Sequence, residues 1–115
     1  MSNDGVRVSW RAAVLPGNGG AAMYGHLCRI SKSKAVVRMD HNLSPGQRCN
    51  LVLMLPKRDA SEPNHFVEGN CTVTATVLAR MQFHVTFEWS EIKGNGETLL
   101  QERLGLHKQM WSAAY

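Results

Sequence analysis

The chain has 115 residues, of which 43% are hydrophobic and 19% are charged, a composition that is ordinary for a globular protein and excludes wholesale disorder. This length supports one modest hydrophobic core, so we expect a single domain over residues 1–115. The formal net charge of +4 favours anionic partners, among them nucleotides, nucleic acids and acidic protein surfaces.

The first predicted strand covers residues 6–15, whose side chains alternate with the period of two that is typical of a half-buried strand. This alternation places Arg7 and Arg11 on the same face. Residues 16–20, Pro-Gly-Asn-Gly-Gly, are a turn signal, and the alternation resumes at residues 24–31. The two segments are therefore expected to pair as a hairpin.

Further strands are expected between turn and loop residues. They cover residues 35–39, 49–55, 66–79 and 82–89. The strand at 82–89 shows the clearest alternation, so one of its faces belongs to the core and the other faces solvent. In the strand at 66–79, the apolar face consists of Val67, Cys71, Val73, Ala75 and Val77. The charged segment at 56–64, which contains two prolines, is expected to be an exposed loop.

After residues 94–96, Gly-Asn-Gly, the pattern changes to that of an amphipathic helix. Its apolar stripe consists of Leu99, Leu100, Leu104, His107, Met110 and Trp111. About six short antiparallel strands followed by one C-terminal helix indicate an all-β fold, namely a closed or nearly closed barrel with the helix packed on an opening. Closure would remove the exposed strand edges that invite aggregation.

The three cysteines, Cys28, Cys49 and Cys71, lie in apolar segments, which indicates buried reduced thiols and a cytoplasmic location. No segment has the length of a membrane span, and the N-terminus lacks a signal pattern. His26 and Cys28 have a spacing that could begin a metal site, but no second ligand pair follows, so no metal is expected. The common catalytic motifs are absent from the sequence, so we expect neither an enzyme nor a cofactor.

Arg7 and Arg11 are the strongest candidates for a binding site, with Ser31 as a third member. Guanidinium groups stay charged and offer planar, forked donors that match a phosphate or a guanine edge. Taken alone, an arginine pair on a strand is usually a solvated face. A serine ahead of a turn often bonds only to nearby backbone.

Several motifs of the chain occur together in one family pattern. They are residues 7–11 (Arg-Val-Ser-Trp-Arg), 25–31 (Gly-His-Leu-Cys-Arg-Ile-Ser) with 35–37, 43–46 ahead of 51–55, and 82–89. With these motifs the chain resembles the PilZ family, small bacterial β-barrel domains that act as receptors for the second messenger cyclic di-GMP. The family site combines Arg-x-x-x-Arg with Asp/Asn-x-Ser-x-x-Gly, so the resemblance implies that Arg7, Arg11 and Ser31 bind cyclic di-GMP.

Arg29 and Lys34 depart from the second motif, which has an acidic or amide residue and a glycine at these positions. Arginine carries donors only, so the acceptor for the N1 and N2 edge of guanine is lost. Lysine adds a Cβ and a long side chain where glycine lets the backbone approach a ligand. Both residues also add positive charge beside a bound diphosphate, which offsets part of the lost acceptor contact but not all of it, so we expect weakened or altered binding.

Three functions remain open at this point. The first is a non-enzymatic cyclic di-GMP receptor module that signals to a protein partner. The second is a nucleotide-independent adaptor, in which the ligand site has decayed and a protein-docking surface remains. The third and less favoured is a single-stranded nucleic-acid-binding barrel, for which steep salt dependence with little base preference is expected.

Overall fold

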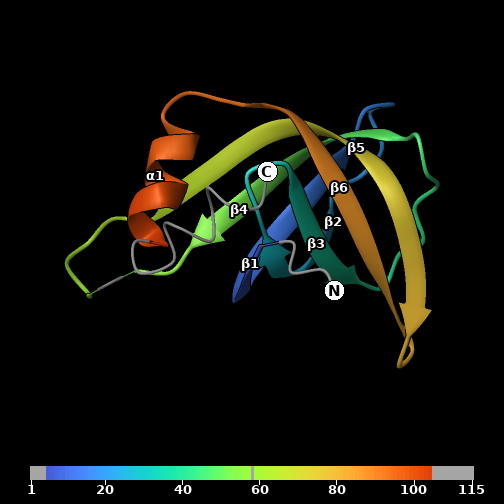
Figure 1. Ribbon diagram of the computed structural model, residues 1–115, viewed down its shortest axis with the longest axis horizontal. Coiled ribbons are helices and arrows are strands. Elements are labelled where there is room, and N and C mark those ends of the chain that lie inside the picture. The colour runs from blue at the N-terminus through green and yellow to red at the C-terminus, as the bar shows by residue number, and fades with distance from the viewer. Residues whose placement is uncertain (1–4, 58, 105–115) are drawn as a thin grey trace.

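The computed structural model describes residues 5–57 and 59–104. Within these ranges six strands close into an antiparallel barrel in the order β1-β2-β3-β6-β5-β4, and one helix follows (Figure 1). The elements are β1 (Val6–Pro16), β2 (Met23–Ile30), β3 (Lys34–Met39), β4 (Arg48–Leu55), β5 (His65–Ala79), β6 (Gln82–Ile92) and α1 (Gly96–Arg103). The predicted barrel with a C-terminal helix is confirmed.

The inward positions of the strands form the core, as the alternation of side chains predicts. Fully buried apolar side chains come from every strand, and they include Val14, Leu27, Val37, Leu53, Val67 and Phe87. Leu100 of α1 and Leu104, which directly follows the helix, join this core, and the helix packs against β5. The remaining predicted members of the helical stripe, His107, Met110 and Trp111, lie outside the described residues.

The predicted apolar face of β5 is wrong in its second half. Val73 is buried, whereas Ala75 and Val77 are exposed. The pairing of β5 with β6 shifts register between Val73 and Ala75, and Figure 1 shows the β5–β6 hairpin continuing past the ends of the neighbouring strands. A pattern of alternation identifies a face, but burial requires a core opposite that face, and the outer part of the hairpin has none.

The cysteines are all free, and their burial differs. Cys49 and Cys71 are buried, as predicted, whereas Cys28 is only partly buried. Burial raises the pKa of the Cys49 thiol. Burial, with a smaller contribution from neighbouring Cys49, raises the pKa of Cys71 to about 12. Both buried thiols therefore stay protonated at neutral pH and are poor nucleophiles.

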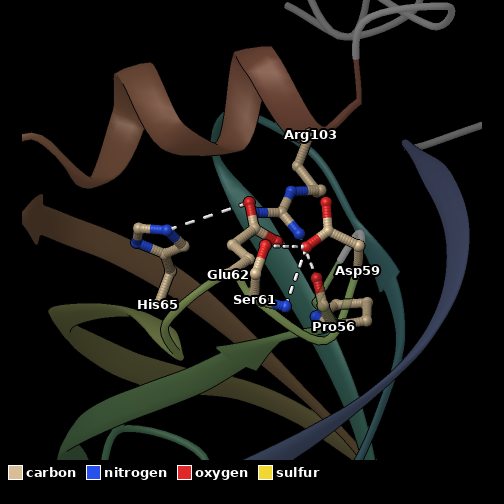
Figure 2. A network of polar contacts seen from close by, with 6 residues as sticks. All are labelled: Pro56, Asp59, Ser61, Glu62, His65 and Arg103. Carbon is tan, nitrogen blue, oxygen red and sulfur yellow. Dashed lines mark hydrogen bonds and ion pairs between the residues drawn. The ribbon is translucent and has the colours of Figure 1, made fainter.

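The loop between β4 and β5 is held to helix α1 by polar contacts (Figure 2). Arg103, in the last turn of α1, donates from Nη1 to the carbonyl of Pro56. Its Nη2 lies 3.7 Å from Glu62 Oε1, and both side chains are 11% exposed. Within the loop, the Ser61 backbone and hydroxyl donate to Asp59 Oδ1 at 2.9 and 2.6 Å. The loop is exposed over most of its length, as predicted, but it also anchors the helix.

Replacing Arg103 with alanine is expected to lower the free energy of unfolding by about 1–2 kcal/mol, because the loop loses a charge-assisted hydrogen bond and a mostly buried ion pair. Urea denaturation measures this change. Arg48→Ala is the matched control, since Arg48 is exposed on β4. Equal stability of the two variants would contradict an anchoring role for Arg103.

Candidate functional site

Arg7 lies beside the turn that contains Ser31. Arg7 is exposed on β1 and stands directly opposite Arg29 of β2. Ser31 follows two residues after Arg29, immediately beyond the end of β2. The structure therefore brings Arg7, Arg29 and Ser31 to one end of the β1–β2 pair. Like charges directly opposite each other destabilise a sheet unless an anion offsets them.

The Ser31 hydroxyl closes the turn between β2 and β3. Ser31 N donates to the Lys34 carbonyl at 2.8 Å, and Lys34 N donates to Ser31 Oγ at 3.1 Å. Ser31 is only 1% exposed, and Gly5 lies against it. Gly5 has a φ of +112°, and a Cβ at this position would lie 2.2 Å from the Ile30 carbonyl oxygen. Glycine is thus required at residue 5 for this close approach.

Arg11 is exposed on the same strand but lies away from the Ser31 turn. Arg11 lies four residues beyond Arg7, and the pairing of β1 with β2 is irregular between Arg7 and Trp10, so their Cα atoms are at most about 13 Å apart, the span of a regular strand of that length. Arg11 stands opposite His26 of β2 and Met54 of β4. The two arginines therefore share one outer surface, but their surroundings differ.

A basic row crosses four strands at the level of Arg11. It consists of Arg11 on β1, His26 on β2, Arg38 on β3 and His84 on β6, each opposite the next. Adjacent strands lie about 4.8 Å apart, so the row extends over about 14 Å. Arg11, His26 and Arg38 are exposed, and His84 is half-buried. The sequence-based interpretation missed this row, since only the strand order brings the four residues together.

Two depressions meet at Arg11. The larger, of about 520 Å³, lies over β1, β2, β3 and the start of β6. Its polar and aromatic lining is provided by Arg11, Tyr24, His26, Arg38, Asp40 and Gln82. Gln82 Nε2 donates to Asp40 Oδ1 at 3.1 Å. The smaller depression, of about 240 Å³, is largely apolar and is lined by Tyr24, Val52, Met54 and Phe66 in addition to Arg11 and two alanines.

Neither a metal centre nor a membrane-spanning helix is found in residues 5–57 and 59–104. No group of three or more histidine, cysteine, aspartate or glutamate side chains there could hold a metal ion. None of the described helical residues belongs to a helix long and apolar enough to cross a bilayer.

No family model matches the chain, and no curated protein matches its sequence. Among solved structures, the chain is similar to the Bacillus subtilis inhibitor of motility MotI/DgrA, with a TM-score of 0.71 and 20% identity over 96% of this chain. The fold is PilZ-like. The match covers 52% of the Bacillus subtilis chain, so this chain spans about half the length of that protein.

In this PilZ-like barrel, the two positions that depart from the family motif have well-defined neighbours. Arg29 is half-buried and stands between Arg7 on β1 and Val36 on β3. Lys34 begins β3 and stands opposite Glu88 of β6. The lysine is therefore placed beside a carboxylate, whereas Arg29 adds its positive charge to that of Arg7.

Proposed function

We propose that the chain is a non-enzymatic, cytoplasmic receptor domain for cyclic di-GMP, with Arg7, Arg11 and Ser31 in its ligand site. The observation that carries this proposal is the cross-strand pair of Arg7 and Arg29 beside the Ser31 turn. Two like charges in register form a site whose electrostatic energy falls when an anion binds. A phosphodiester group supplies that anion.

The spacing of the two motif arginines suits a ligand with two phosphodiester groups. Arg7 lies opposite Arg29, beside the Ser31 turn, and Arg11 lies four residues further along β1, at most about 13 Å away. Each guanidinium donates forked hydrogen bonds to one end of the ligand. Ser31 contributes by holding the turn, because its hydroxyl accepts from Lys34 N and the Gly5 segment covers it.

The expected output is a changed surface that is offered to a protein partner. The similar Bacillus subtilis protein is named an inhibitor of motility, which supports a regulatory function without a reaction. Ligand binding at Arg7 would act on the start of β1, whose preceding residue Gly5 lies against the Ile30 carbonyl. Gly5 and the first residues of β1 are therefore the part of the barrel that we expect to respond.

A nucleotide-independent adaptor is the second candidate function. Two observations favour it. Ser31 is 1% exposed and engaged by its own turn, and Arg29 offers no acceptor to a guanine edge. In this function the PilZ-like barrel would present its surface to a protein partner without a nucleotide.

Isothermal titration calorimetry with cyclic di-GMP at near-physiological salt tests the proposal. We expect micromolar or tighter binding by the wild type and a loss of more than about 100-fold in the Arg7→Ala, Arg11→Ala double variant, since each charge-assisted contact contributes about 1.5 kcal/mol or more. The control is Arg48→Ala, Lys57→Ala, which removes the same charge from exposed positions elsewhere. Absence of binding by the wild type would favour the adaptor. Full affinity in the double variant would place the site elsewhere.

A further inference from the structure

The basic row offers a second phosphate contact beside Arg11. His26 stands between Arg11 and Arg38 in register, so the two arginine Cα atoms are about 10 Å apart across the sheet. Their side chains are long enough to converge above His26. An anion at that point would receive donors from both guanidinium groups and from a ring N–H of His26.

Asp40 is a carboxylate acceptor at the depression over β3, whereas Arg29 offers only donors. Asp40 follows Arg38 by two residues, immediately beyond the end of β3, and lines the same depression. Gln82 of β6 donates to one carboxylate oxygen of Asp40 at 3.1 Å. A carboxylate has about four lone-pair sites, so Asp40 retains capacity for the N1 and N2 donors of guanine. The contact with Gln82 also fixes the direction of the carboxylate.

The shape of this region suits a nucleotide. A volume of about 520 Å³ lies within the range of roughly 300–1,000 Å³ that is usual for small-molecule sites. Tyr24 is 72% exposed and lies at the border of both depressions. An exposed aromatic ring beside basic side chains is a surface on which a base can stack.

We infer that Arg38 and Asp40 belong to the ligand site, where Arg38 and Arg11 bind one phosphodiester group and Asp40 selects guanine. This inference rests on the proposed function and extends it, because it assigns base recognition to a residue outside the family motif. The ligand then reaches from the Ser31 turn to the depression over β3. The positively charged arginines bind its phosphates, and the Asp40 carboxylate accepts hydrogen bonds from its guanine base.

Calorimetry with cyclic di-GMP and cyclic di-AMP, on the full chain, tests this inference. Asp40→Asn keeps an acceptor oxygen for Gln82 but replaces one acceptor with a donor. It is expected to lower the affinity for cyclic di-GMP by about 10-fold or more and to leave cyclic di-AMP within about 2-fold. Arg38→Ala is expected to lower both affinities by about 10-fold. Glu97→Gln and Arg48→Ala are the matched controls, since both residues are exposed and lie outside the depression.

The outcomes separate this inference from the proposed function. Unchanged affinities in Asp40→Asn and Arg38→Ala, with binding lost in the Arg7, Arg11 double variant, would overturn the inference and leave the receptor function standing. An equal loss for both dinucleotides in Asp40→Asn would overturn guanine selection. No binding of cyclic di-GMP by the wild type would overturn the receptor function and the inference with it.

Discussion

Replacing Phe87 with alanine is expected to lower the free energy of unfolding by about 3–5 kcal/mol. Phe87 is 0% exposed and is the largest of the fully buried side chains in the described residues. It stands between Ala35 on β3 and Val73 on β5, so its ring fills interior space beside two smaller side chains. Removing the ring reduces the apolar surface that is buried on folding. It also leaves a cavity, which the closed barrel cannot easily fill by rearrangement of its strands.

Phe66→Ala is the matched control for this prediction. Phe66 lies on β5 but is 54% exposed, so the same substitution is expected to change the free energy of unfolding by less than about 1 kcal/mol. Urea denaturation of both variants measures the difference. Since small domains are stable by about 5–15 kcal/mol, the loss at Phe87 is large enough to shift the midpoint clearly. Similar urea midpoints for the two variants would show that burial of Phe87 does not make the expected contribution to stability.

The strands could be predicted from the sequence because their signal is local. The alternation around Phe87 identifies β6 directly, and the Pro-Gly-Asn-Gly-Gly turn at residues 16–20 separates β1 from β2. The end of β6 was predicted at Trp89, whereas the strand continues to Ile92. Those last residues still pair with β5 through their backbone. Backbone pairing cannot be recognised from the alternation of side chains, so the end of the strand was predicted too early.

The site was less predictable, since its geometry depends on contacts between distant residues. Arg38 and His84 become neighbours only because β3 pairs with β6, and strand order cannot be read from alternation. The burial of Ser31 depends on the position of Gly5, which lies 26 residues earlier in the chain and is not specified by the residues around Ser31. The motif residues could therefore be identified as candidates from the sequence. The role proposed for Asp40 could be inferred only from the arrangement of strands in the barrel.

Gly25→Ala is expected to lower the free energy of unfolding by up to about 3 kcal/mol through overpacking. Gly25 lies on β2, opposite Ala12 of β1 and Met39 of β3. A Cβ at this position would lie 2.5 Å from the Arg38 carbonyl oxygen and 3.0 Å from Met39 Cβ. Because the closest atom belongs to the backbone, a side-chain rotation cannot relieve the contact, and β3 must move away from β2.

This movement couples stability to the proposed site, since the displaced residue is Arg38 itself. Under conditions where the variant remains folded, we expect Gly25→Ala to bind cyclic di-GMP more weakly than the wild type. Gly20→Ala is the control, because the nearest atoms to a Cβ there belong to side chains, namely Asn18 Oδ1 at 3.1 Å and the Pro16 ring. Urea denaturation and calorimetry measure the two effects.

A Gly25→Ala variant as stable as Gly20→Ala would show that β2 and β3 tolerate the added methyl. A destabilised variant with unchanged affinity would separate the packing of β3 from ligand binding and would argue against a contact through Arg38.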